Sequence, residues 1–536
     1  MAGRTWLAVI LACMVWFTYV QWFVPPPPPK PTQPVAAQTG TPTDPSGTVP
    51  TMPTGQQAFS IPPPALKPVH EFKNGKLELE FSSAGGRISD AAVTGYRETI
   101  KKDAPPIHLV RRDQSGYDLS ALFTDESLKE FGGAEYQGRA LADGYLFEHE
   151  NATARITKTY KADAESHFVR SDIQLVFKDT TQGNRGYLIL PVGGRDLKFD
   201  HNHPLESWQV AAYINDTLTR KNTDQLSEGE MVFQGASHWL GFGNRYFSTA
   251  LINESALNPD VVLVKRPDFQ GAFFRYPLQL KPDQKEIAIS YRTYIGPKDY
   301  AILSTVPGMR QLIDYGTFSF LAYPLLELLR FFYKFVHNYG VAIILLTLLV
   351  RLLFYPLSVK SARSMKAMQR LQPQIQALKE KYKDDTQRFN QEQMALFKAH
   401  KVNPLGGCLP MLIQLPVFFA LYSVLGNSIE LFHAPFFGWV QDLSGKDPYY
   451  VFPILMGISM FFQQKMTPMA GMDPMQQKMM MIMPVVFSFI MINLPSGLTV
   501  YIFLSTLLGI GQQLIINREH AASGVTLATA KEPAKS

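Results

Sequence analysis

A single positive charge interrupts one apolar stretch in the second half of the chain, Val341-Ala-Ile-Ile-Leu-Leu-Thr-Leu-Leu-Val-Arg-Leu-Leu-Phe-Tyr-Pro-Leu357. The stretch has 17 residues, close to the ~20 that a helix needs to cross a bilayer. A charge such as Arg351 costs from ~2.5 to over ~10 kcal/mol inside a membrane, so it normally faces protein or a water-filled cavity. The stretch therefore predicts a membrane helix whose arginine faces a bundle interior. Snorkelling of the side chain to the membrane surface is the alternative.

Five further apolar runs predict a protein with six membrane spans. The first run is followed by the prolines 25–29, which favours an uncleaved anchor over a signal peptide or a lipoprotein signal ending at Cys13. The segment 317–336 mixes apolar and charged residues and predicts an interfacial amphipathic helix rather than a span. The five runs are Trp6–Val24, Cys408–Leu425, Tyr449–Phe462, Met479–Leu494 and Leu498–Ile516.

The charges of the loops predict the orientation. Residues 358–407 carry ten Lys or Arg and four Asp or Glu, whereas Lys446 is the only Lys or Arg of 426–448. Basic loops stay in the cytoplasm, so six spans place both termini in the cytoplasm. For a bacterial chain, the compartment on the opposite side is the periplasm. The surplus of six positive charges in this loop equals the net charge of +6 of the 536-residue chain, which is too weak to indicate nucleic-acid binding.

Two cysteines, both in or beside apolar runs, exclude a disulfide scaffold.

The segment before the arginine-bearing stretch has a different pattern. Short stretches such as Ala154-Arg-Ile-Thr-Lys-Thr-Tyr160 alternate between apolar and polar residues, which is typical of half-buried antiparallel strands. The expected fold is a polytopic α-helical membrane protein with a large all-β periplasmic β-sandwich domain. Its predicted parts are an anchor (1–24), a Pro-rich linker (25–70), the β-sandwich (71–300), the interfacial helix (317–336), a five-span core (337–516) containing a cytoplasmic helical hairpin (358–403), and a cytoplasmic tail (517–536).

No Asp or Glu occurs within the five C-terminal apolar runs to pair with Arg351. An unpaired cation in a bundle implies a hydrated cavity that receives a polar or negatively charged visitor. The runs offer several polar residues that could line this cavity, although each alone is also explained as an interhelical hydrogen-bonding group. They are Thr347, Gln414, Tyr501, Ser505, Gln512 and Gln513.

Two other features leave alternatives open. The basic loop has apolar residues at helical spacing on both sides of Lys383, which predicts a helical hairpin, or else a solvated connector whose charges only set topology. Eleven methionines fall between Met456 and Met491. Thioethers can bind Cu(I), but no Cys or His accompanies them, so an adaptable apolar surface or plain core packing is favoured.

The sequence offers little support for an enzyme. His201 and His203 could chelate a metal from one strand face, but no third ligand is evident, and surface histidines are the simpler reading. No nucleophile elbow, phosphate loop or zinc motif is present. No metal, cofactor or catalytic residue is therefore expected.

Several blocks in order resemble the bacterial YidC membrane protein insertases of the YidC/Oxa family, in the long form with a periplasmic domain. The resemblance covers essentially the whole chain. The blocks are Leu348-Leu-Val-Arg-Leu-Leu-Phe-Tyr-Pro-Leu357, Leu371-Gln-Pro-Gln-Ile-Gln-Ala-Leu-Lys-Glu-Lys-Tyr382, Asn403-Pro-Leu-Gly-Gly-Cys-Leu-Pro410 and Leu494-Pro-Ser-Gly-Leu498.

The resemblance implies a chaperone-like insertase that helps new proteins enter and fold in the inner membrane without consuming nucleotide. In the family, a hydrophilic groove opens to the cytoplasm and the lipid, and its central arginine corresponds to Arg351. An apolar slide would guide the client helix into lipid, through Leu415, Pro416, Phe418, Val485, Val486 and Ile490. The hairpin would recruit clients, with the basic residues Lys366, Arg370, Lys379, Lys381 and Lys383.

The partners implied by the resemblance are nascent membrane proteins, the lipid bilayer and the Sec translocon (SecYEG, SecDF), with the ribosome and the signal recognition particle pathway as further candidates. One departure concerns the ribosome: the tail after Arg518 is short and has only two lysines, Lys531 and Lys535. Two other classes of protein are the alternatives. A transporter or channel would need repeated spans and paired ion ligands, and a membrane-anchored carbohydrate enzyme would need a matched carboxylate pair in the β-domain.

Overall fold

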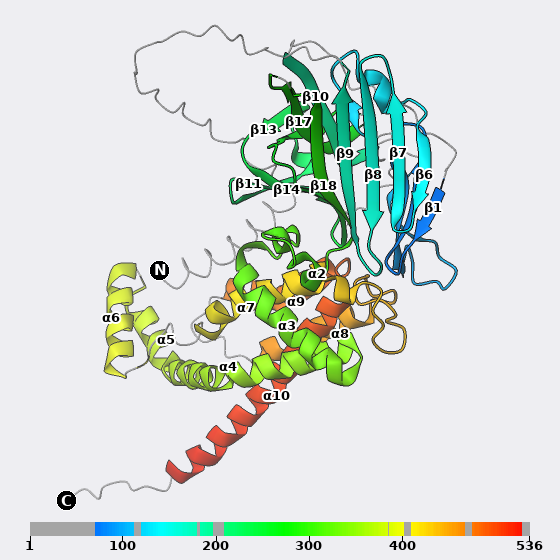
Figure 1. Cartoon of the computed structure of the whole chain (residues 1–536). Helices are drawn as coiled ribbons and strands as arrows, with labels where there is room; N and C mark the ends of the chain where they lie inside the picture. Colours follow the sequence, from blue (N-terminus) through cyan, green and yellow to red (C-terminus); the bar gives the residue numbers. More distant parts are fainter. Residues whose placement is uncertain are drawn as a thin grey trace, which may run out of the picture.

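The computed structural model describes residues 70–527 apart from 112–118, 179–182, 197–207, 268, 283, 384, 401, 403–408 and 467–473. It contains a strand-rich unit, called the β-domain (residues 70–297), and a unit of helices, called the helical core (residues 300–527). Figure 1 shows the sheets stacked on one side of the helices, with α2 (Tyr300–Leu303) at the junction.

The strands of the β-domain form three antiparallel sheets. The first, in spatial order, consists of β1 (His70–Lys73), β2 (Leu77–Ser82), β3 (Arg87–Arg97) and β4 (Pro106–Val110). The second consists of β13 (Gly229–Phe233), β16 (Asp260–Lys265), β17 (Phe269–Leu280), β10 (Gly183–Asp196) and β5 (Leu122–Phe123). The third consists of β12 (Thr217–Asn222), β11 (Gln209–Ile214), β14 (Ser237–Gly243), β15 (Phe247–Asn253), β18 (Glu286–Pro297), β9 (Phe168–Phe177), β8 (Ala154–Ala162), β7 (Gly144–Glu150) and β6 (Gln137–Leu141). Inward side chains of all three sheets share one hydrophobic core.

Strand β8 shows how the alternating pattern becomes a buried face. Ala154, Ile156 and Tyr160 are at most 1% exposed, while Arg155 between them is exposed. The same alternation turns Lys158 inward, and its side chain is 0% exposed. The alternating pattern thus places an amine in the core.

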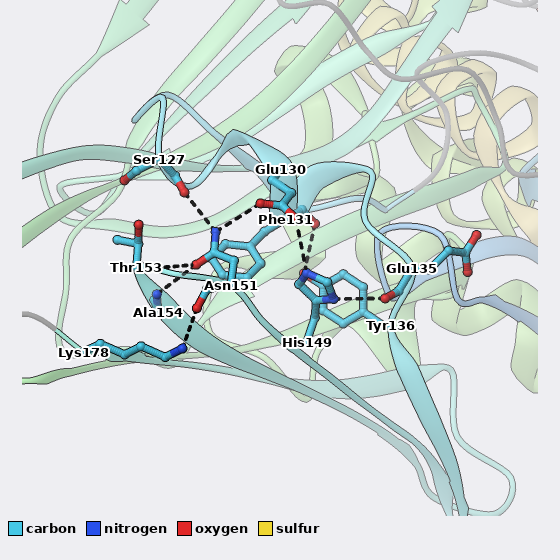
Figure 2. A network of polar contacts seen from close by, with 10 residues as sticks. All are labelled: Ser127, Glu130, Phe131, Glu135, Tyr136, His149, Asn151, Thr153, Ala154 and Lys178. Atoms are coloured by element: carbon cyan, nitrogen blue, oxygen red, sulfur yellow. Dashed lines mark hydrogen bonds and ion pairs between the residues drawn. The ribbon is translucent and has the colours of Figure 1, made fainter.

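A polar network ties the 3₁₀ helix η1 (Lys129–Gly132) and the residues just before it to the turn between β7 and β8 (Figure 2). The Asn151 side-chain oxygen accepts hydrogen bonds from the backbone N–H groups of Thr153 and Ala154, both at 2.9 Å. Its amide nitrogen donates to the Ser127 carbonyl at 3.1 Å, and Lys178 donates to the Asn151 carbonyl at 2.6 Å. One asparagine therefore closes the hairpin and anchors the neighbouring loop.

The helical core contains α3 (Ser319–Val336), α4 (Tyr339–Arg370), α5 (Gln372–Lys381), α6 (Thr386–Ala399), α7 (Leu409–Asn427), α8 (Val451–Met466), α9 (Pro474–Met491) and α10 (Ser496–Leu527), with short 3₁₀ turns that include η6 (Ile429–Leu431). Within the described part of the chain, α4 and the segment Ser496–Ile516 of α10 are long and apolar enough to cross a membrane. Helices α8 and α9 have 16 and 18 residues. They are slightly longer than their apolar runs because each includes polar residues at one end.

Helix α4 does not end with its apolar stretch. It continues without interruption to Arg370, so the first part of the predicted hairpin belongs to α4, and α5 and α6 form the antiparallel pair at one side of the body (Figure 1). The break comes at Leu371 because Pro373, in the first turn of α5, starts a new helix. Leu371, Ile375 and Phe397 form the small core of this pair.

A continuous apolar cluster joins the β-domain to the helical core. It runs from Trp239 and Tyr294 through Leu303 to Leu326 and Leu346. Since the cluster includes residues of both units, they pack as one body at this junction.

Polar contacts reinforce this junction. The Tyr246 hydroxyl donates to the Gly426 carbonyl at 3.1 Å, and the Asn427 side chain donates to the Asp314 carbonyl at 2.7 Å. The Asp314 carboxylate also pairs with Arg220 of β12 at 2.8 Å. The end of α7 is therefore hydrogen-bonded both to the β-domain and to the segment around Asp314, which connects the β-domain to α3.

The segment Leu494–Leu498 locks the start of α10 to the loop between α7 and α8. The Ser496 N–H donates to the Gly445 carbonyl at 2.7 Å, and the Gly497 N–H donates to the Leu443 carbonyl at 2.9 Å. A Cβ on Gly497 would lie 3.2 Å from that same Leu443 oxygen. The glycine therefore allows the close approach.

Several predictions fall outside the described residues. They are the anchor 1–24, most of the linker 25–70, the histidines His201 and His203, Cys408 and the end of the tail, 528–536.

Candidate functional site

The predicted intramembrane arginine lies against α10. Arg351 Nε donates to the Ser505 hydroxyl at 3.1 Å, and its Nη2 donates to the same hydroxyl at 2.8 Å. Nη2 also donates to the Ser505 backbone carbonyl. Because these partners are neutral, they stabilise the charge through dipoles and do not cancel it.

Two of the predicted groove residues flank this contact. Tyr501, one turn before Ser505, is 3% exposed and interacts with the Ser505 side chain and with the charge of Arg351. Thr347, one turn before Arg351, is also buried, but its hydroxyl donates to the Ile343 carbonyl of its own helix at 2.6 Å. Thr347 therefore contributes volume and shape to this site, because its hydroxyl hydrogen already bonds to the Ile343 carbonyl and is not donated to another group.

The structure adds two residues that the sequence analysis missed. A Cβ placed on Gly509 would lie 2.6 Å from the Gln463 Nε2 atom and 3.4 Å from the Arg351 Nη2 atom. Gln463 belongs to α8, so three helices meet at this point. Gln463 follows the apolar run that ends at Phe462, and the predicted span boundary excluded it. Gly509 follows Ser505 by four residues, but this spacing does not indicate a site unless the positions of the partner helices are known.

The remaining polar candidates are less closely connected to the arginine. Gln414 is half-buried on α7, whereas the described polar contacts of Arg351 come from α10. Gln512 lies one turn beyond Gly509, and its buried Nε2 atom has no hydrogen-bond partner among the described residues. Gln513 also takes part in polar interactions.

An exposed apolar surface lies on α9. Three residues of the predicted slide lie on it: Val485 is 64% exposed, Val486 46% and Ile490 37%. Phe489 at 76% and Ile482 at 59% were not predicted but extend the same surface.

The α7 part of the predicted slide has a different character. Leu415, Pro416 and Phe418 are half-buried, and Phe418 packs against the cluster that joins the two units. Of the predicted slide residues, those on α9 are therefore the exposed ones. Exposed apolar side chains also lie on other helices, for example Leu352 and Leu353 of α4, each 72% exposed.

The predicted recruitment residues lie on α4, α5 and the turn after α5. Arg370, Lys379, Lys381 and Lys383 are exposed, and Lys366 is half-buried. An open cleft of about 520 Å³ lies between α5 and α6, and Lys381 and Glu392 stand at its border with Leu378 and Leu396. Of the five recruitment residues, Lys381 is the one that lines this partly apolar cleft.

No group of three His, Cys, Asp or Glu in the described part of the chain could hold a metal ion.

Comparisons with known proteins agree with the architecture. The family described as 60Kd inner membrane protein matches residues 331–523, and the family described as YidC periplasmic domain matches residues 70–328. A membrane protein insertase YidC of Geobacter metallireducens is 38% identical over 551 residues, covering 98% of this chain and 99% of the relative. Another, from Syntrophus aciditrophicus, is 37% identical over 458 residues, covering 82% and 83%.

A solved structure described as an active YidC insertase with its first transmembrane domain resolved has a TM-score of 0.35 and 19% identity, and covers 83% of this chain and 91% of that one. The relatives are named as insertases, which are not enzymes. The two family matches cover most of the chain, and the relatives match it nearly from end to end. The chain therefore belongs to the YidC family of membrane protein insertases.

Proposed function

We propose that this protein inserts membrane proteins through a polar groove centred on Arg351, and that the exposed surface of α9 passes the client helix to lipid. The observation that carries the proposal is the arginine itself: it lies in an apolar helix and is held by the neutral groups of Ser505. A cation held in this way keeps its charge available for an anionic group of a client.

The groove acts by binding a charge in transit. A carboxylate in the tail of a client is attracted to Arg351 and can replace or join its contacts with Ser505. This interaction lowers the cost of bringing the tail into the membrane, because a paired charge is less unfavourable there than an isolated one.

The driving force comes from the apolar part of the client. Its helix leaves water and slides along Val485, Val486, Phe489 and Ile490 of α9 into the bilayer. Burial of apolar surface gives about 25 cal/mol per Å², so a whole membrane helix supplies enough free energy without nucleotide hydrolysis.

The proposed setting is the bacterial inner membrane, with six spans, both termini in the cytoplasm and the β-domain in the periplasm. The positive charges of α5 and its flanking segments favour this orientation. The same charges would meet nascent clients at the membrane surface. Cooperation with the Sec translocon, and with the ribosome and signal recognition particle pathway, is part of the proposal.

The proposal is tested with purified protein in liposomes and two single-span clients that differ only in an acidic or a neutral translocated tail. Protection of the tail from added protease measures insertion. Arg351→Ala is expected to reduce insertion of the acidic-tail client about ten-fold, since a charge-assisted contact contributes about 1.5–3 kcal/mol. The neutral-tail client should be less affected.

Arg363→Ala is the matched control, because it removes an exposed positive charge from the same helix. It should leave insertion of both clients unchanged. Arg351→Lys separates charge from guanidinium geometry. Normal insertion of the acidic-tail client by folded Arg351→Ala protein would contradict the proposed role of the arginine.

A further inference from the structure

Gly509 of α10 lies where α4 and α8 also contribute side chains, Arg351 and Gln463. The residue is buried in the middle of α10, one turn after Ser505. An added Cβ would come within 2.6 Å of Gln463 Nε2, a distance that real Cβ atoms do not tolerate, and within 3.4 Å of Arg351 Nη2. The missing side chain therefore provides the space in which the amide and the guanidinium lie.

The backbone of α10 does not require this glycine. Gly509 is absent from the residues of the described chain with positive φ, and it lies in a regular helix. A glycine in a helix interior is less favourable than alanine by about 1 kcal/mol. The reason for glycine at this position must therefore lie in its neighbours.

Gly511 provides the contrast within the same helix. A Cβ on Gly511 would meet no atom within 4 Å. Both glycines lie in the same turn of α10, so alanine at either position should improve the intrinsic helix propensity equally. Only the substitution at Gly509 crowds the arginine site.

We infer that Gly509 is a positioning residue of the client-binding groove. It keeps the Arg351 guanidinium against Ser505 and lets the Gln463 amide reach the same space, so that a client carboxylate meets charged and neutral donors together. The inference rests on the proposed function, because it assigns Gly509 a role in presenting Arg351 to acidic clients.

The side chain that an alanine would displace is flexible. The 2.6 Å contact involves the terminal amide of Gln463, which can rotate away without disturbing the backbone. Gly509→Ala is therefore expected to fold. Its effect should be local: a displaced amide and a crowded guanidinium.

The test uses the full chain in liposomes with the acidic-tail and neutral-tail clients. Gly509→Ala should lower insertion of the acidic-tail client about five-fold, equivalent to ~1 kcal/mol, and Gly509→Leu should lower it further. Gly511→Ala should match the unmodified protein with both clients. A general packing defect would instead reduce insertion of both clients by the same factor.

A second variant separates positioning from mere crowding of the helices. Gln463→Ala removes the atom that an alanine at 509 would strike, so the pair Gly509→Ala with Gln463→Ala should insert the acidic-tail client better than the product of the two single effects predicts. Thermal unfolding of each variant in detergent confirms that it is folded.

Three outcomes decide the inference. Equal insertion by Gly509→Ala and Gly511→Ala, with Arg351→Ala impaired, would overturn the role of Gly509 alone. Multiplicative effects of Gly509→Ala and Gln463→Ala would also overturn it. Normal insertion by Arg351→Ala would overturn the proposed function, and this inference with it.

Discussion

Arg351 and Ser505 are 154 residues apart in the sequence, yet the guanidinium donates to both the hydroxyl and the backbone carbonyl of the serine. The hydroxyl lies 3.1 Å from Nε and 2.8 Å from Nη2. The arginine is thereby fixed to α10 by two acceptors of a single residue. This contact holds the cation in place while leaving it without a neutralising charge at Ser505.

Replacement of Ser505 by alanine should weaken this contact but not abolish it. The hydroxyl is lost while the backbone carbonyl remains, so we expect Ser505→Ala to lower the free energy of unfolding by about 1.5–3 kcal/mol, the range for hydrogen bonds to charged groups. Thermal unfolding of the purified protein measures the effect. Ser459→Ala is the control: Ser459 is equally buried at 6% but donates only to the Met456 carbonyl of its own helix. Equal destabilisation by both variants would show that the arginine contact adds no stability.

Asn338 should contribute to stability through two separable contacts. Its side-chain oxygen caps α4 by accepting from the Val341 N–H at 3.0 Å, and its amide donates to the Phe436 carbonyl at 3.0 Å. Asn338→Ala loses both and should destabilise the protein by more than the ~1 kcal/mol of an N-cap alone. Asn338→Ser retains a capping oxygen but cannot reach the Phe436 carbonyl. Its unfolding temperature should therefore lie between those of the unmodified protein and Asn338→Ala. If serine proves as destabilising as alanine, the cap is not the stabilising contact.

Glu430 should make stability depend on pH. It lies in η6, outside the membrane-spanning helices, with its carboxylate 3.7 Å from Arg330, and burial raises its pKa from 4.5 to about 7. Between pH 4.5 and about pH 7, Glu430 is therefore mostly protonated in the folded protein and mostly ionised in the unfolded chain. Stability contributed by this group is complete below pH 4.5 and is lost as pH rises through 7.

Glu430→Gln should remove this pH dependence, because glutamine retains the shape but does not titrate. Unfolding temperatures measured between pH 5 and pH 8 should fall with pH in the unmodified protein and change less in the variant. Glu327→Gln is the control, since Glu327 contacts the same Arg330 at 3.5 Å but is 58% exposed. An unchanged slope in Glu430→Gln would show that another group carries the effect.

Lys158 should produce the opposite pH dependence at higher pH. Its amine donates to the Gly85 carbonyl at 2.6 Å and lies 4.7 Å from the Tyr136 ring centre. Burial, reinforced by the charge of Arg87, lowers its pKa from 10.5 to about 7. Between about pH 7 and pH 10.5, Lys158 is therefore mostly protonated in the unfolded chain and mostly neutral in the folded protein. Stability should rise as pH increases from 7 toward 10.

Lys158→Met should flatten that rise, because the thioether side chain has a similar length and no charge. Lys161→Met, in the same strand but with an exposed side chain, is the control and should behave like the unmodified protein. Unfolding of the full chain followed by near-ultraviolet circular dichroism at pH 7 and pH 9 tests both. A pH slope that persists in Lys158→Met would exclude the lysine as its source.

Much of the architecture was predictable because its signals are local. Alternation in segments such as 154–160 reports which side of a strand is buried, and an apolar run of 17 residues reports a helix that is stable in lipid. The unusual position of Arg351 was equally visible, since a charge within such a run is rare whatever surrounds it. These features need no knowledge of distant neighbours.

Tertiary structure alone decided what the arginine contacts. Ser505 was one of several polar residues at plausible positions, and only the packing of α4 against α10 selects it over Gln414. Gly509 and Gln463 carry no local signal, because their importance lies in one shared space. Likewise, Lys158 falls on the inward face by simple alternation, but only three assembled sheets remove its amine from water. The sequence by itself determined which segments fold and where a charge is unusual. The energy of that charge depends on atoms from other helices, which come together only in the folded chain.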